Sequence, residues 1–229
     1  MKFGVVVFPG SNCDMDMVYV LETIMKQEVV KLWHKDIDLQ GCDFIILPGG
    51  FSYGDYLRSG AIARFSPIMK EIIGFANAGG YVMGICNGFQ ILTESGLLPG
   101  VLLHNTSHKF ICKNTYLKAE TQNTLVTNQY TDSAVKIPIA HGEGKYFADE
   151  KTLESLIKND QILFKYCVKN GNINAEANPN GSLLNIAGVC NVERNVFGMM
   201  PHPERAADRE LNNQDGILLF ESILNDVFT

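Results

Sequence analysis

Short apolar segments alternate with helical ones through residues 3–95, and this alternation is the strongest constraint on the fold. The strand-like runs are residues 3–8, 29–33, 44–47 and 81–85, and the helical segments between and after them are residues 14–26, 67–78 and 87–95. Strands that are separated by helices are joined by crossovers and therefore pair in parallel. The first half predicts a doubly wound α/β fold, an open and mostly parallel sheet flanked by helices.

Residues that begin and end helices support these boundaries. Asp14 falls in the first turn of one helix, where the helix dipole favours an acidic side chain. Ser66 and Pro67 supply an N-cap and a first-turn proline for the next helix, and Gly79 and Gly96 follow the ends of two helices. These residues bound each helix to the stretch between two strands, as expected for a crossover connection.

The second half is less regular, and we expect it to add strands to the sheet. Strand-like patterns cover residues 109–120, 124–128, 135–140, 162–167, 183–191 and 196–200. Asp149 is placed to cap a helix that runs to about residue 158. A final amphipathic helix carries Ile217, Phe220, Leu224 and Val227 on one face. Because no repeat, low-complexity tract or linker interrupts the chain, we expect one domain over residues 1–229.

Composition excludes several classes of protein. Hydrophobic residues make up 46% of the chain and charged residues 19%, which is typical of a globular domain. The formal net charge of −6 leaves no basic surface for nucleic acid. The apolar runs are too short to span a bilayer, and the first one ends at Pro9 without a cleavage site. We therefore expect a cytoplasmic protein that binds neither nucleic acid nor membrane.

The six cysteines predict neither a disulfide scaffold nor a metal site. Their spacings are wide and irregular, and the sequence has no CxxC pair. His104 and His108 are four residues apart, which suits a metal on a helix, but they lie among Asn, Thr and Ser residues typical of a polar loop. We expect no metal in this chain.

The candidate chemistry lies where the fourth strand meets the next helix, at Gly84-Ile85-Cys86-Asn87-Gly88. This is the nucleophile-elbow pattern with cysteine in place of serine. The turn places Cys86 at a helix N-terminus, whose amides and dipole favour the thiolate, and the amide of Asn87 can donate to an oxyanion. Pro48-Gly49-Gly50 ends the preceding strand and can supply a second donor. A buried structural cysteine and an ordinary glycine turn remain the alternatives.

A thiolate nucleophile needs a base, and two segments offer one. His202-Pro203-Glu204 follows one strand, and His141-Gly142-Glu143 follows another. In either segment the carboxylate can accept a hydrogen bond from one ring nitrogen while the other nitrogen faces the sulfur. Pro203 stiffens the first segment, whereas Gly142 loosens the second, so we favour His202 and Glu204. Local physics alone leaves both open.

The order of these motifs resembles the class I, or triad, glutamine amidotransferases. More narrowly, the chain resembles the glutaminase subunits of phosphoribosylformylglycinamidine synthase, an enzyme of purine biosynthesis. The motifs are FPGSNCD at residues 8–14, PGGFSYGDYLRSGAIA at 48–63, GICNGFQIL at 84–92, HGEGKY at 141–146 and MMPHPER at 199–205. The resemblance implies that Cys86, His202 and Glu204 form the triad. It also implies that the amides of Gly50 and Asn87 form the oxyanion hole and that Gln90 lies beside the glutamine pocket.

The resemblance further implies what this chain needs from other proteins. The sequence has no GxxxxGK[ST] phosphate loop, so we expect no cofactor in this chain, and ATP and Mg on a partner. The expected partners are the synthetase large subunit, which acts on formylglycinamide ribonucleotide, and a small accessory subunit. By the same resemblance Cys13 is structural, HGEG is an active-site or interface loop, and Asp55, Tyr56 and Arg58 are packing or partner-contact residues. The segment 104–132 matches less clearly and receives no role.

Two other classes of function remain open from the sequence. A stand-alone peptidase or deglycase-like hydrolase of related fold also uses a cysteine elbow, although the PHPE segment far downstream of the elbow argues against it. A non-catalytic, flavodoxin-like binding module would bury Cys86 as an inert thiol. A glutaminase assay set against a peptidase assay separates the first class, and selective iodoacetamide labelling separates the second.

Overall fold

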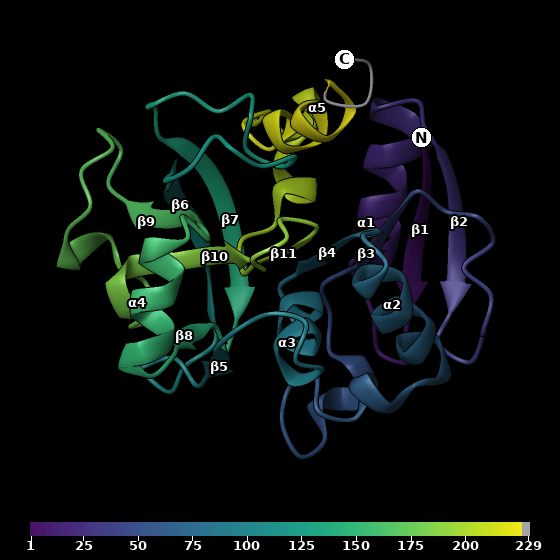
Figure 1. Ribbon diagram of the computed structural model, residues 1–229. Coiled ribbons are helices and arrows are strands. Elements are labelled where there is room, and N and C mark those ends of the chain that lie inside the picture. Colours follow the sequence, from purple (N-terminus) through teal and green to yellow (C-terminus); the bar gives the residue numbers. More distant parts are fainter. Residues whose placement is uncertain (226–229) are drawn as a thin grey trace.

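The computed structural model describes residues 1–225, which form a nine-stranded sheet with helices on both faces (Figure 1). In spatial order the strands are β2 (Glu28–Trp33), β1 (Lys2–Val7), β3 (Phe44–Leu47), β4 (Tyr81–Ile85), β11 (Val196–Met199), β10 (Ile186–Cys190), β9 (Ile162–Cys167), β6 (Ile111–Ala119) and β7 (Val135–His141). The strands from β2 to β11 pair in parallel, and those from β11 to β7 pair antiparallel. The predicted α/β class is confirmed, and the second half supplies the extra strands.

Within the described residues, five α-helices connect or flank the strands. They are α1 (Asp14–Tyr19), which continues as the π-helical turn Val20–Ile24, α2 (Pro67–Asn77), α3 (Asn87–Glu94), α4 (Glu150–Lys158) and α5 (Ile217–Asn225). Asp149 caps α4 as predicted, because its carboxylate accepts from the amide of Thr152 at 2.8 Å. Ser66 occupies the N-cap position of α2 but makes no capping bond, since its hydroxyl is 2.9 Å from that of Tyr53.

The core follows the middle of the sheet because both faces of this part are covered. Every residue of β3, β10 and β11 is buried, which fits their continuous apolar sequences. Burying one large apolar side chain contributes about 1.5–3 kcal/mol, so this layer fixes the relative positions of the strand ends. The loops that follow β3, β4 and β11 therefore emerge side by side at the carboxyl edge of a rigid sheet.

The antiparallel half bends back over that edge. Strand β7 lies at the far end of the sheet, yet the carbonyl of Pro138 in β7 accepts from the amide of His202 at 2.8 Å. The carbonyl of Ala140 lies 3.8 Å from the sulfur of Cys86. Figure 1 shows β7 beside β11, although three strands separate them in the sheet order. This curvature places the segment after β7 above the end of β4.

Some predicted elements are wrong or displaced. Residues 124–128 form turns instead of a strand, since the hydroxyls of Thr124 and Thr127 bond each other and the amide of Thr127 bonds the carbonyl of Thr124. Residues 183–185 form a 3-10 turn, with Leu184 at φ 52°, so the strand begins only at Ile186. The patterns missed a small sheet of β5 (Val101–Leu103) and β8 (Lys145–Phe147).

The described part of the last helix packs the predicted face against the core and buries further residues beside it. Leu219, Phe220 and Ile223 are buried, whereas Ile217 and Leu224 are half-buried against the same core. Val227, the fourth member of the predicted face, lies outside the described residues. Within residues 1–225, none of the helices has the length and apolarity that crossing a bilayer requires.

Candidate active site

Cys86 lies on a strained turn between β4 and α3. Its backbone has φ 51° and ψ −106°, a conformation that residues with a side chain rarely adopt, and it precedes the first residue of α3. A Cβ at Gly88 would lie 1.9 Å from the carbonyl oxygen of Leu47, and one at Gly84 would lie 2.5 Å from the backbone of Gly88. The flanking glycines thus let the elbow pass against β3, and the sulfur projects from the sheet edge at a helix N-terminus.

His202 and Glu204 follow the neighbouring strand β11 and form a buried pair. Nδ1 of His202 lies 2.6 Å from Oε1 of Glu204, and the two residues are only 2% and 3% exposed. Burial by itself disfavours the imidazolium. The negative charges of Glu204 and Cys86 outweigh that effect, so the pKa of His202 lies well above its ordinary value of 6.5. The arrangement favours the imidazolium form of His202.

The second His-x-Glu segment is built differently. Nδ1 of His141 lies 3.1 Å from the side-chain oxygen of Asn105, whose amide nitrogen donates to the carbonyls of Lys109 and His141. Burial, with a smaller effect of His202, lowers the pKa of His141 to about 4 and leaves this imidazole neutral at pH 7. The carboxylate of Glu143 accepts from the amide of Ser59 instead of bonding to His141. Of the two segments, only residues 202–204 place the histidine and the carboxylate within hydrogen-bond distance of each other.

Cys13, which we expected to be structural, lies against the ring of His202. The His202 ring lies beside the sulfur of Cys13 as well as that of Cys86, and Arg205 donates to the Cys13 sulfur at 3.1 Å. Donor atoms of Cys13, His202 and Glu204 lie within 4.8 Å of one another, which is compact enough for a cation. The guanidinium of Arg205 opposes a positive ion at this point, so the cluster does not fit a resident metal.

The residues expected to form the oxyanion hole surround the elbow. Asn87 is the first residue of α3, and the amide at such a position has no partner within the helix. Gly50 has φ 141°, and a Cβ there would lie 2.8 Å from the backbone of Ser11 and Asn12. The side chain of Gln90 accepts from Asn87 at 2.9 Å and donates to the carbonyl of Glu143 at 2.6 Å. Gln90 therefore ties the elbow to the segment after β7.

A cavity of about 150 Å³ opens beside the sulfur of Cys86. Its walls come from the loop after β3, from Cys86 and Gln90, and from residues 140–143 at the end of β7. Asp55, which we expected to be a packing or partner-contact residue, lines this cavity together with Glu143. Of the other two residues expected there, Tyr56 is 73% exposed, and Arg58 bonds to Glu94 at 2.7 Å on the outer side of the loop.

The comparisons with known proteins identify the family. A family profile described as a CobB/CobQ-like glutamine amidotransferase domain matches residues 1–217. The phosphoribosylformylglycinamidine synthase subunit PurQ of Koribacter versatilis (strain Ellin345) is 56% identical over 225 residues, covering 98% of this chain and 97% of that protein. The chain belongs to the PurQ family. It is a glutamine amidotransferase, the glutaminase subunit of phosphoribosylformylglycinamidine synthase in purine biosynthesis, as the motifs predicted.

Solved structures agree with this assignment to the PurQ family. A chain in the structure of PurLQS from Thermotoga maritima superposes with a TM-score of 0.86 at 45% identity, covering 99% of this chain and 98% of that one. Another glutamine amidotransferase from Thermotoga maritima shares only 13% identity but superposes with a TM-score of 0.56, over 99% and 91% of the two chains. Because its sequence identity is low, the second superposition supports only the fold of the PurQ chain.

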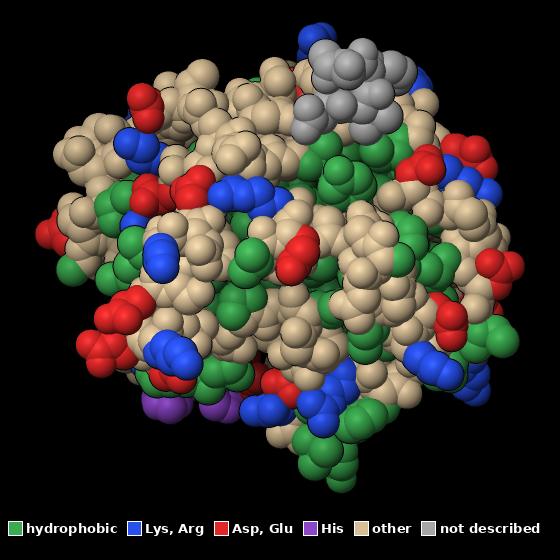
Figure 2. Space-filling model, in the orientation of Figure 1, with side chains coloured by type: hydrophobic (Ala, Val, Ile, Leu, Met, Phe, Trp, Pro, Cys, Tyr) green, Lys and Arg blue, Asp and Glu red, His purple; other side chains and the backbone are tan. Residues whose placement is uncertain are grey.

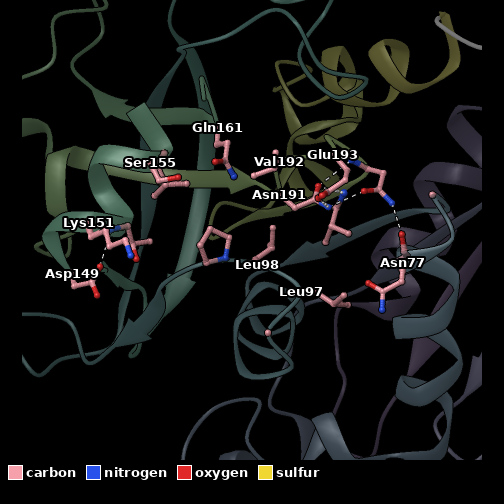
Figure 3. Close-up of a pocket in the computed structure, with 18 residues that line it drawn as sticks. Asn77, Leu97, Leu98, Asp149, Lys151, Ser155, Gln161, Asn191, Val192 and Glu193 are labelled. Carbon is pink, nitrogen blue, oxygen red and sulfur yellow. Dashed lines mark hydrogen bonds between the residues drawn. The ribbon is translucent and has the colours of Figure 1, made fainter. Parts of the chain in front are cut away.

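A larger cavity of the PurQ chain lies at the opposite edge of the sheet. It measures about 810 Å³ and is walled by α4, by the segment after α3 and by the turn that precedes β11 (Figure 3). Asn77 and Asn191 lie at its rim, before the amino ends of β4 and β11, whereas Cys86 and His202 follow the carboxyl ends of the same strands. Size alone is therefore a poor guide to the chemistry of this molecule.

Proposed function

We propose that this chain hydrolyses L-glutamine through a thioester on Cys86, with His202 as acid and base and Glu204 orienting the imidazole. The observation that carries the proposal is the buried pair of His202 and Glu204, 2.6 Å apart, beside a cysteine on a strained strand-to-helix turn. In a chain of the PurQ family, this constellation fits amide hydrolysis by a cysteine triad.

The first half of the reaction breaks the carboxamide bond of glutamine. The Cys86 thiolate attacks the side-chain carbonyl carbon, and the negative charge moves to the carbonyl oxygen. The amides of Gly50 and Asn87 donate to that oxyanion, and such donors act strongly because they are fixed before the reaction begins. The imidazolium of His202 then gives its proton to the departing nitrogen, so ammonia leaves and a glutamyl thioester remains.

The second half of the reaction releases glutamate. His202, now neutral, removes a proton from water, which attacks the thioester carbonyl through a second oxyanion. The carbon–sulfur bond breaks, and Cys86 returns to the thiolate beside the imidazolium. Glu204 remains ionised throughout and holds Nδ1 of His202, so that Nε2 faces the reacting atoms.

The ammonia is proposed to pass to a separate ATP-dependent synthetase that converts formylglycinamide ribonucleotide to formylglycinamidine ribonucleotide. A complex of three kinds of subunit is supported by the likeness to the structure of PurLQS from Thermotoga maritima. We propose that this chain assembles with two corresponding partners, the large synthetase and the small accessory protein. ATP and Mg would bind to the synthetase, and this chain would carry no cofactor of its own.

The test compares two cysteine variants in the assembled complex. Cys86→Ala should abolish glutamine-dependent synthesis, while ammonium salts should still support product formation by the same complex. Cys112→Ala is the matched control, because this thiol is exposed on β6 and does not line the cavity beside Cys86. Glutamine-dependent activity of Cys86→Ala within a few-fold of the unmodified chain, in a folded protein, would contradict the proposal.

A further inference from the structure

The cavity beside Cys86 has an acidic wall that the proposed reaction does not yet use. Asp55 and Glu143 both line it, one from the loop after β3 and the other from the segment after β7. Among the described residues that form this cavity there is no lysine or arginine. Two carboxylates therefore border a small space in which no side chain of fixed positive charge balances them.

Hydrogen bonds fix the positions of both carboxylates. Oε2 of Glu143 accepts from the amide of Ser59 at 3.3 Å, and its backbone carbonyl accepts from Gln90 at 2.6 Å. Asp55 accepts from the side chain of Ser59, and its Oδ1 lies 3.4 Å from the side-chain nitrogen of Asn87. Both acids thus share Ser59, and Asn87 and Gln90 of the elbow helix hold the two segments together.

The surroundings of Asp55 disfavour its negative charge. Burial raises the pKa of Asp55 to about 6, the negative charge of Glu143 acts in the same direction, and the bond from Ser59 opposes both. The only basic side chain that contacts either acid within the described residues is the exposed His104, whose Nδ1 is 3.5 Å from Oε1 of Glu143. A positive group inside the pocket would remove this penalty by pairing with the carboxylates.

L-Glutamine brings such a group. Its carboxamide must reach Cys86, and its other end carries an α-ammonium and an α-carboxylate. We propose that Asp55 and Glu143 bind the α-ammonium group of glutamine and thereby determine the selectivity for α-amino substrates. Repulsion turns the α-carboxylate of the substrate away from the same wall. The inference rests on the proposed nucleophile, because the position of Cys86 sets the direction in which glutamine enters.

The test uses glutaramate, which is glutamine without its α-amino group. In the complex with the synthetase and the accessory protein, we expect the unmodified chain to prefer glutamine over glutaramate in kcat/KM. Asp55→Asn should reduce this preference roughly 10- to 100-fold, because a charged hydrogen bond is lost for one substrate only. Glu143→Gln should reduce it in the same direction. Glu154→Gln, an exposed carboxylate on α4, is the control for the change in net charge and should leave the preference unaltered.

The comparison of two substrates separates binding from general damage. A variant that is merely distorted loses activity toward glutamine and glutaramate alike, so the ratio stays constant, and that outcome would overturn the inference. Iodoacetamide carries no ammonium and should label Cys86 equally in all variants. If the unmodified chain hydrolyses no glutamine and Cys86 is unreactive, the proposed function itself has failed, which is a different result.

A measurement on the unmodified chain covers the case in which the variants do not fold. The preference for glutamine over glutaramate should fall as the pH drops through about 6, where Asp55 takes up a proton. The groups facing Asp55 are Glu143 and, beyond it, His104, while Cys86 and His202 act on both substrates alike and cancel in the ratio. A ratio that does not change between pH 5 and pH 8 would contradict the inference.

Discussion

At the scale of single residues, the structure distinguishes two segments that look alike in sequence. His202 bonds to the carboxylate two residues later, and both groups are buried. His141 bonds instead to Asn105, and the carboxylate of Glu143 turns toward Ser59 and His104. The same spacing therefore favours an imidazolium in one place and a neutral imidazole in the other, and only the first fits the proposed role of proton donor to the departing nitrogen.

Replacing the two histidines should separate their roles. His202→Ala should lower the glutaminase kcat by about 10⁴-fold, since thiolate formation and protonation of the leaving group both fail. His141→Ala should cost far less and should act through substrate binding, because His141 borders the cavity and is already neutral. Steady-state glutamine hydrolysis by the two variants measures the difference. Equal losses, or a larger loss at His141, would show that the triad is assigned to the wrong segment.

Asp55 should reveal its role through stability as well as through activity. Its pKa is raised from 3.8 to about 6 in the folded chain, so folding favours the protonated form. The stability that this provides is complete below about pH 4 and is lost as the pH rises through about 6. Asp55→Asn should therefore raise the midpoint of thermal unfolding by roughly 1–3 °C at pH 7.5 and change it little at pH 4. A packing role for Asp55 predicts a lower midpoint at both pH values.

At the scale of elements, the elbow depends on a close approach between α3 and β3. A methyl group at Gly88 would lie 1.9 Å from the carbonyl oxygen of Leu47, and the backbone of Leu47 cannot move without disturbing its pairing with Gly84 in β4. We expect Gly88→Ala to lower the free energy of unfolding by about 3 kcal/mol or more. Gly74→Ala is the matched control, because Gly74 is exposed in α2 with nothing within 4 Å of its Cβ position.

The control variant Gly74→Ala should change the free energy of unfolding in the opposite direction. Alanine within a helix is more stable than glycine by about 0.5–1 kcal/mol, so Gly74→Ala should raise the free energy of unfolding slightly. Urea denaturation measures both variants on the same scale. If Gly88→Ala were as stable as the unmodified chain, the elbow would not need the contact with β3, and the account of why Cys86 is held in a strained conformation would be incorrect.

The elements that the sequence predicts well are those whose signal is local. Strands β3 and β9 begin and end where their apolar runs do, and Asp149 caps α4, because burial on both faces and a capping carboxylate are visible in a few adjacent residues. The predicted strand at residues 124–128 is wrong because a hydrogen bond between threonine hydroxyls competes with strand pairing, and an alternating pattern does not reveal that bond. The strand predicted to begin at residue 183 begins later because Leu184 lies in a turn with a positive φ, which the apolar pattern does not reveal.

The candidate site divides in the same way. Cys86, His202 and Glu204 could be proposed from the sequence because each lies in a short motif after an apolar strand. The positions of Cys13, Asp55 and Glu143 depend on contacts between segments that are far apart in the chain. Glu143 reaches the pocket only because β7 returns over the carboxyl ends of β4 and β11, and no local pattern encodes that curvature.

At the scale of the whole molecule, the site opens on an edge that also carries exposed apolar side chains. Tyr56 and Leu57 are 73% and 84% exposed in the segment between β3 and α2, and Phe65 is 74% exposed. Figure 2 shows apolar side chains protruding at the lower edge of the molecule, where Figure 1 draws this segment below α3. We expect the synthetase to contact this edge, because ammonia then leaves the pocket close to the partner.

Assembly should control the rate of glutamine hydrolysis. Gly50, with φ 141°, lies in the same segment, and a glycine peptide can rotate at little cost, so one oxyanion donor can be misaligned until the partner docks. We expect the chain alone to hydrolyse glutamine at least about 100-fold more slowly than the complex with synthetase, accessory protein, ATP analogue and acceptor. Equal rates for the chain alone and the complex would mean that the oxyanion hole is already formed in the free chain.

The proposed reaction carries a glutamyl group as a thioester on one particular sulfur. The decisive measurement is an acid quench of the assembled enzyme during turnover of radiolabelled glutamine, followed by peptide mapping of the labelled protein. We expect one glutamyl group per active chain, on the peptide that contains Cys86, and its loss in Cys86→Ala. Label on the peptide of Cys13, whose sulfur also lies beside His202, or full turnover with no labelled cysteine, would contradict the proposed reaction.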